Sequence, residues 1–176
     1  MPPGDLRFGI APSSCYLHSD MANYTTIFPP DQSSFVPSDE AVTQAKLLLE
    51  HACPDYPVTS RRYAPPSFIT SGSGFEKFTC PNCRKLVKSY YLDEEGKHWW
   101  YTVLWDLRDE NQVIKVPCCG AELAVKEFDF GKDTAFASFT LSVEGLSDEE
   151  GISGGELAAI ESALGCSVRQ IVEVDG

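Results

Sequence analysis

Two short cysteine motifs constrain this chain of 176 residues more than any other feature. The CPNC motif at 80–83 has the spacing of a zinc knuckle, whose turn points both sulfurs to one side. A tetrahedral metal then needs a second pair of ligands, and the PCCG motif at 117–120 offers two thiols some tens of residues later. Gly120 permits a tight backbone turn behind the metal. The sequence therefore predicts one structural zinc site, formed by Cys80, Cys83, Cys118 and Cys119.

The second motif departs from the usual pattern of a knuckle. An ordinary second knuckle reads Cys-Pro-x-Cys-Gly, and superposing it on VPCCG at 116–120 puts Val116 at the first ligand position. Cys119 is then the secure ligand, and Cys118 has to rotate in to supply the fourth thiolate. If it does not, His98 or water completes the site, and a water bound to zinc can ionise near neutral pH.

Three alternatives to a closed structural site follow from this departure. An open position would suit a zinc-dependent hydrolase or transferase, for which Glu122 is the nearest candidate base in the sequence. A ribbon that has lost its metal is the second alternative, and a redox-active cysteine pair is the third. Against redox chemistry, the module lacks the strand-then-helix setting of thioredoxin-like proteins.

Cysteine usage and hydropathy indicate a soluble protein of a reducing compartment. The chain has seven cysteines, an odd number, and four of them lie in the two motifs, which favours metal binding over a disulfide framework. No apolar run approaches the roughly 18 residues that a membrane span needs. The N-terminus also lacks the basic-then-apolar order of a secretory signal. We therefore expect a cytoplasmic protein with no membrane partner.

The charge of the chain indicates what kind of partner it could bind. The net charge is -12, and the part from Lys85 onward holds 18 acidic and 8 basic side chains. Such a field repels phosphate backbones and attracts basic surfaces, so we expect a basic protein partner and no nucleic acid. The alternative is that acidity only aids solubility.

The patterns along the chain predict an α+β fold with a small mixed or antiparallel sheet. The first strand–helix–strand segment has a strand at 23–28, a helix from the N-cap Ser38 to about Ala52, and short strands at 58–63 and 67–70. The second has a strand at 135–143, a helix that Ser153 and Glu156 open as a capping box and Gly165 closes, and a strand at 168–174.

The domain organisation that we predict is one compact domain in four parts. A loose segment at 1–22 precedes the first strand–helix–strand part at 23–74. A zinc-ribbon-like insert follows at 75–124, and the second strand–helix–strand part occupies 125–176. The SGSG sequence at 71–74 marks the first boundary of the insert.

A dense aromatic patch within the insert is a candidate anchor for a partner. The pattern after Gly96 predicts a short helix that carries Trp99 and Trp100, and a core role for the rings is the favoured interpretation. Any exposed ring would become an anchor for a protein partner. Acidic side chains surround the patch and would steer association: Asp93, Glu94, Glu95, Asp106, Asp109 and Glu110.

The order and spacing of several sequence blocks resemble a known group of proteins. CPNC, a WW pair, VPCCGAEL, FASFTL and ELAAIESALGCSVRQI follow one another between Phe75 and Val174. This arrangement resembles uncharacterised bacterial proteins that carry a PCCG motif after a two-cysteine knuckle. The resemblance implies that Cys118 and Cys119 act as a unit and that both sulfurs are ligands. By analogy of class, a small acidic protein of this kind would be an immunity or adaptor protein that is not an enzyme.

Overall fold

The computed structural model describes residues 23–72, 75, 77–88, 98, 99, 103, 107, 109–146 and 151–175. The predicted loose segment at 1–22 and most of the predicted helix after Gly96 therefore lie outside the described residues. The elements in chain order are β1 (Asn23–Phe28), α1 (Asp39–Ala52), β2 (Val58–Thr70), β3 (Lys77–Thr79), β4 (Leu86–Lys88), β5 (Val113–Lys115), β6 (Glu122–Ala124), the 3-10 helix η1 (Val125–Glu127), β7 (Thr134–Glu144), α3 (Gly154–Leu164) and β8 (Ile171–Asp175).

The fold is α+β, as the sequence predicts, and its main sheet has four antiparallel strands. Their order is β2-β7-β1-β8. In this order β7 lies between β1 and β2, the two strands of the segment β1–α1–β2. Likewise β1 lies between β7 and β8, the two strands of the segment β7–α3–β8. The two strand–helix–strand segments therefore interlock as a split β-α-β pair.

The helices α1 and α3 begin where the sequence predicts, because their caps satisfy the first free amides. The Ser38 hydroxyl accepts a hydrogen bond from the Ala41 amide at the start of α1. At the start of α3, Ser153 and Glu156 form the predicted capping box, with each side chain accepting from the other's amide. Gly165 ends α3 in the left-handed conformation, with φ 75°.

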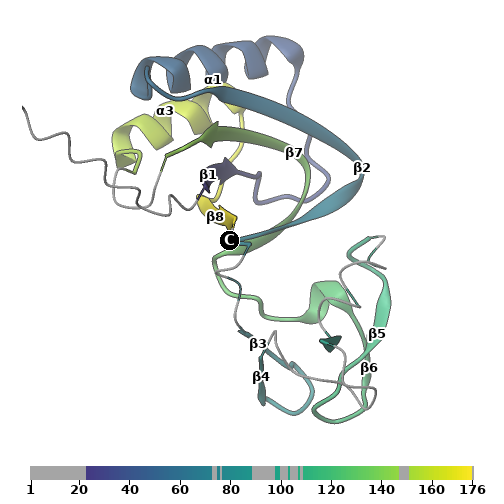
Figure 1. Cartoon of the computed structure of the whole chain (residues 1–176). Coiled ribbons are helices and arrows are strands. Elements are labelled where there is room, and N and C mark those ends of the chain that lie inside the picture. The colour runs from purple at the N-terminus through teal and green to yellow at the C-terminus, as the bar shows by residue number, and fades with distance from the viewer. Residues whose placement is uncertain are drawn as a thin grey trace, which may run out of the picture.

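The two helices lie side by side on one face of the sheet (Figure 1). Leu49 of α1 and Ile160 of α3 pack there against Phe139 of β7, and none of these side chains is more than 1% exposed. Leu164 is also buried, whereas Leu157, expected on the same face, is half-buried. This layer forms the larger hydrophobic core of the protein. Burial of its apolar side chains stabilises the packing of the helices on the sheet.

Two predictions about strands need correction. The strands expected at 58–63 and 67–70 are one strand, β2, whose register with β7 shifts between Arg62 and Ser67. Pro65 and Pro66 lie in this interval; proline lacks an amide donor, so it interrupts the pairing while the chain stays extended. The last strand starts at Ile171 rather than Val168, which forms only an isolated bridge with Pro30.

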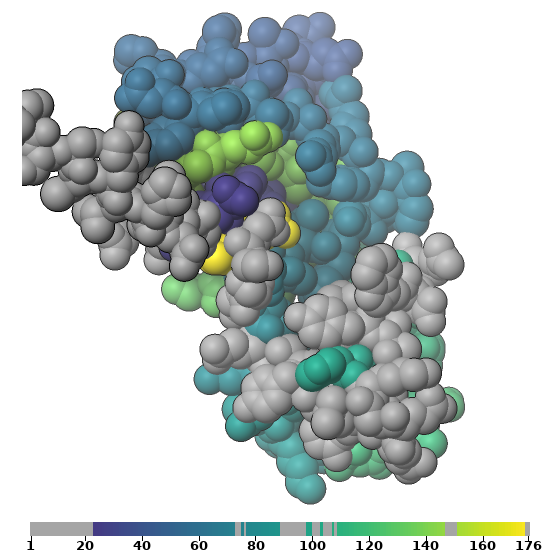
Figure 2. All heavy atoms as spheres, in the orientation of Figure 1, coloured from purple at the N-terminus to yellow at the C-terminus, as the bar shows by residue number. Residues whose placement is uncertain are grey.

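The cysteine-containing part of the chain connects β2 to β7 and lies at one end of the molecule (Figure 2). It contains two short hairpins, β3–β4 and β5–β6. Its own hydrophobic core includes Phe78 and Val116, and Phe68 of β2 and Phe136 of β7 pack against that core. The two long strands of the sheet thus also support the cysteine hairpins.

Candidate metal centre

The first cysteine motif forms a tight turn at the tip of the β3–β4 hairpin. The Cys80 amide donates to the Lys85 carbonyl (3.0 Å), and the Arg84 amide donates to the Cys80 carbonyl (2.9 Å). Arg84 has φ 60°, a left-handed conformation that residues other than glycine rarely adopt. The turn brings Cys80, which is fully buried, and the half-buried Cys83 to the same end of the hairpin.

The second motif repeats this turn at the tip of the β5–β6 hairpin. The Val116 amide donates to the Ala121 carbonyl (2.9 Å), and the Gly120 amide donates to the Val116 carbonyl (2.8 Å). Gly120 has φ 70°, close to the value at Arg84 in the first turn. By this hydrogen-bond pattern Val116 takes the place of Cys80, as the superposition of the sequences predicts.

The four cysteine sulfurs form one cluster in which all lie within 4.8 Å of one another. The separations are 3.4 Å from Cys83 to Cys118, 3.9 Å from Cys80 to Cys119, and 3.9 Å from Cys118 to Cys119. Four sulfurs bound tetrahedrally at about 2.3 Å from a zinc ion are about 3.8 Å apart. The cluster therefore has the size and composition to hold one metal ion.

The position of Cys118 explains how the irregular second motif supplies two sulfurs. Val116 is fully buried in the core of the module, so the first position of this turn contributes packing and no thiol. Cys118, at the third position, turns its sulfur toward Cys83 of the other hairpin. Asn82 occupies the third position of the first turn, and its side-chain amide donates to the Cys119 sulfur (3.5 Å). Both hairpins thus use their third residue to reach across to the other.

The surroundings shift the pKa values of two of the thiols in opposite directions. Hydrogen bonds from the Asn82 side chain and the Ala121 amide lower the pKa of Cys119 to about 7. Burial, followed by hydrogen bonds with the neighbouring thiols, raises the pKa of Cys118 well above its usual range. Four thiols this close cannot all ionise without a cation between them, because like charges at such distances disfavour the charged form.

Exposed basic side chains lie along the first hairpin, a feature that the sequence reasoning missed. Lys77, Arg84, Lys85 and Lys88 are all exposed, and residues 77–88 include no acidic side chain. Lys77 and Lys88 are direct partners across the β3–β4 ladder, an arrangement that is unfavourable for like charges. A divalent ion held by four thiolates has a net charge of about -2, which these cations would offset.

His98, which was proposed to complete an open site, does not belong to the cluster, and neither does Glu122, the proposed base. The group contains four cysteines, and within the described residues no histidine or carboxylate joins it. His98 is exposed, and Glu122 lies on β6 opposite Lys115 of β5. The described part of the chain therefore places thiols alone at the centre.

Only some of the predicted partner-binding residues lie in the described part of the chain. Asp93, Glu94, Glu95, Trp100 and Asp106 lie outside the described residues. Trp99 is half-buried and packs against Phe78, with ring centroids 5.9 Å apart. Asp109 and Glu110 are half-buried, and each lines a cavity beside Phe68 and Phe136. Two of the predicted acidic residues therefore lie where the module meets the sheet.

Comparison with known proteins does not identify a family for this chain. No family model, curated protein or solved structure matches the chain. Among the described residues, none of the helices has the length and apolar character that crossing a membrane requires. The resemblance to bacterial PCCG proteins and the zinc-ribbon identity of the module both stay predictions.

Proposed function

We propose that the protein is a non-enzymatic binding protein, of the immunity or adaptor type, whose cysteine module is held in shape by one structural zinc ion. The single observation that supports the metal most strongly is the four-sulfur cluster. Three of its sulfur–sulfur separations, 3.4–3.9 Å, are close to the tetrahedral spacing of zinc thiolates, and all of them lie within 4.8 Å. Four thiolates fill a tetrahedral coordination shell, which is typical of structural rather than catalytic zinc.

The role of the zinc follows from the small size of the module. Its strands are three residues long, and hairpins of that length are marginal alone. The metal would join the tips of both hairpins and stabilise their common core. Zinc would supply binding energy for folding here, and the chain's own cysteines would hold it.

The proposed partner is a basic protein that the chain would recruit or neutralise. The net charge of -12 supports this, because a field of that size accelerates encounter with a cationic surface. Asp109 and Glu110 support it locally, since they place carboxylates beside aromatic rings at the junction of module and sheet. The acidity that would attract a basic protein would also disfavour nucleic acid.

Two measurements test this proposal. Elemental analysis with native mass spectrometry should give one zinc per chain, bound without modification of the four thiols. Proteins that co-purify with the chain should include one with an excess of basic residues, and calorimetry with that purified protein should show an affinity that falls at least about tenfold between low and high salt. A partner that binds equally well in high salt, or a chain that purifies without metal and remains folded, would contradict the proposal.

The alternative is a zinc-dependent hydrolase or transferase in which Cys118 leaves a coordination position to water. The observation that favours it is the irregular second turn, in which the buried Val116 occupies the position that Cys80 has in the first turn. Its discriminating feature would be a water ligand on the bound metal.

A further inference from the structure

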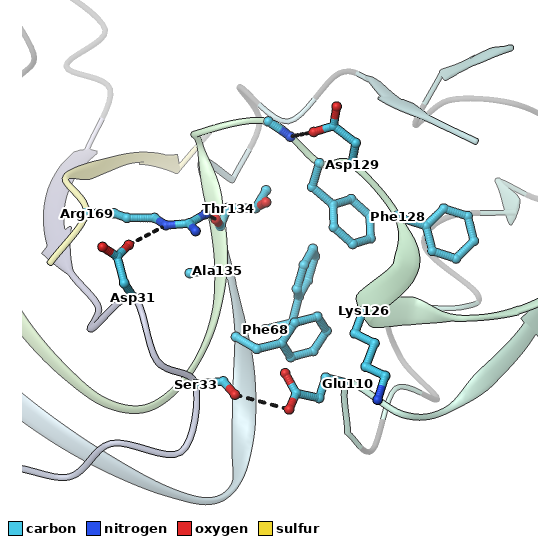
Figure 3. A pocket seen from close by; sticks show the side chains of 13 residues that line it. Asp31, Ser33, Phe68, Glu110, Lys126, Phe128, Asp129, Thr134, Ala135 and Arg169 are labelled. Carbon is cyan, nitrogen blue, oxygen red and sulfur yellow. Dashed lines mark hydrogen bonds and ion pairs between the residues drawn. The ribbon is translucent and has the colours of Figure 1, made fainter. Parts of the chain in front are cut away.

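A cavity of about 410 Å³ lies where the cysteine module meets the sheet. Figure 3 shows it with the Phe68 ring near its centre, the Asp31–Arg169 pair on one side and Lys126 on the other. Its volume is within the range of small-ligand pockets, which run from about 300 to 1,000 Å³. The cavity is therefore large enough to receive one long side chain or a small molecule.

Aromatic rings form the apolar part of the cavity. The ring centroid of Phe68 is 4.9 Å from that of Phe136 and 5.1 Å from that of Phe130. All three rings are half-buried and line the opening. Ring faces of this kind attract cations that approach within about 6 Å of the centroid.

The two cations of the cavity already have protein partners. Arg169 donates from Nε to Asp31 (2.9 Å) and from one terminal nitrogen to the Thr134 carbonyl (3.1 Å). The Lys126 ammonium donates to the Asn111 side-chain carbonyl (2.7 Å). Arg169 is therefore paired with a carboxylate, whereas Lys126 bonds a neutral group.

The carboxylate of Glu110 is in a different position. It accepts a hydrogen bond from the Ser33 hydroxyl (3.1 Å), a neutral group. Within the described part of the chain, no cation forms an ion pair with Glu110. The Asp129 carboxylate at the rim likewise accepts from a neutral donor, the Gly131 amide (3.0 Å). The described lining thus has three carboxylates and two cations, a net charge of -1, with Glu110 and Asp129 near the phenylalanine rings.

We infer that this cavity receives the guanidinium group of an arginine side chain from the basic partner. A guanidinium is planar and weakly hydrated, so it can stack on a ring of Phe68 or Phe130 while it donates hydrogen bonds to Glu110. The net negative charge of the lining favours a cation over an anionic or neutral ligand. The inference rests on the proposed function, because it assigns the site at which the basic partner is anchored.

The test uses the zinc-loaded full chain and N-acetyl-L-arginine amide as the probe. Amide NMR spectra of the protein should shift saturably, with the largest shifts around Gly131 and Thr134. The matched probe N-acetyl-L-citrulline amide has almost the same shape without the charge, and it should bind at least about tenfold more weakly. Equal binding of the two probes would overturn the inference.

Two variants assign the binding to the cavity. Glu110→Gln keeps an acceptor for Ser33 and removes the charge, so the protein should fold and bind the arginine probe at least about fivefold more weakly. Glu122→Gln removes an exposed carboxylate of the same module that does not line the cavity, and its affinity should match the wild type within about twofold. An unchanged affinity in Glu110→Gln would overturn the inference.

The same variants separate this inference from the proposed function. A basic partner could bind the wild type and Glu110→Gln with the same salt-dependent affinity. That result would support the proposed function but would contradict the role of this cavity in it. Saturable, Glu110-dependent binding of the arginine probe without any basic protein partner would support a cation site and count against the proposed function.

Discussion

Replacing Cys118 by serine tests the least regular feature of the metal centre. The Cys118 sulfur lies 3.4 Å from that of Cys83 and 3.9 Å from that of Cys119, so we expect it to be one of four equivalent ligands. Structural zinc sites bind with apparent free energies of about 10–16 kcal/mol, and an equal share for each ligand is about 3 kcal/mol. A loss of that size corresponds to an affinity about 100-fold lower.

Cobalt(II) titration of the metal-stripped protein measures this loss. The wild type should bind one equivalent, with strong thiolate charge-transfer and tetrahedral bands, and Cys118→Ser should show weaker bands and the lower affinity in competition with a chelator. Cys166→Ser is the matched control, because Cys166 is a half-buried cysteine beyond the end of α3 and outside the cluster. Its affinity should equal that of the wild type.

The outcome that would refute the reasoning is a Cys118→Ser variant with wild-type affinity and an unchanged spectrum. The Cys118 thiolate would then not be a metal ligand. The sulfur separations would not be evidence for tetrahedral coordination. A higher-coordinate spectrum in the wild type itself would instead support the open site and favour the enzyme alternative.

Three further predictions follow from the two turns, from Gly72 and from the capping box of α3. The double variant Val116→Cys/Cys118→Ser should regain at least part of the cobalt affinity that Cys118→Ser loses, because position 116 corresponds to Cys80; no recovery in the titration would contradict that correspondence. Gly72→Ala should lower the free energy of unfolding by about 2 kcal/mol in urea titration, since Gly72 has φ 61° and a β-carbon there would lie 2.6 Å from the Val174 carbonyl oxygen. The pKa of Glu156 is lowered, first by its hydrogen bond with the Ser153 side chain and then by that with the Ser153 amide. The ionised Glu156 therefore stabilises the fold at a pH above the unfolded pKa, and this stabilisation is lost as the pH falls through the folded pKa. The melting temperatures of wild type and Glu156→Gln should differ at neutral pH and become equal in acid.

The helices α1 and α3 and the cysteine cluster were predictable because local rules govern them. Ser38, Ser153 and Gly165 act at the ends of their own helices, where capping depends on neighbouring residues only. The four cysteines of the cluster could be identified because pairs of thiols at short spacings are typical of metal-binding motifs. The sequence also predicted that Val116 and Cys80 occupy the same position in their turns, because a proline follows each of them.

Other features depend on contacts between distant residues and could not be predicted from local patterns. The strand β2 continues past its prolines because β7 pairs with it on both sides of the irregularity. The cavity beside Phe68 needs Asp31, Glu110 and Arg169, which lie far apart in the chain and meet only in the folded structure. The interaction of Asn82 with Cys119 likewise joins two hairpins, and no short motif encodes it.

The connection between β2 and β7 affects the order in which the chain can fold. These strands form the longest ladder of the sheet, yet residues 71–133 separate them. Closing a long flexible loop costs conformational entropy that rises with the logarithm of its length, and distant pairings slow folding. A metal that joins Cys83 to Cys118 roughly halves the free length of this connection, which lowers the closure cost by about 0.6 kcal/mol. Metal supply during synthesis would therefore influence how long the edges of β2 and β7 remain unpaired and open to aggregation.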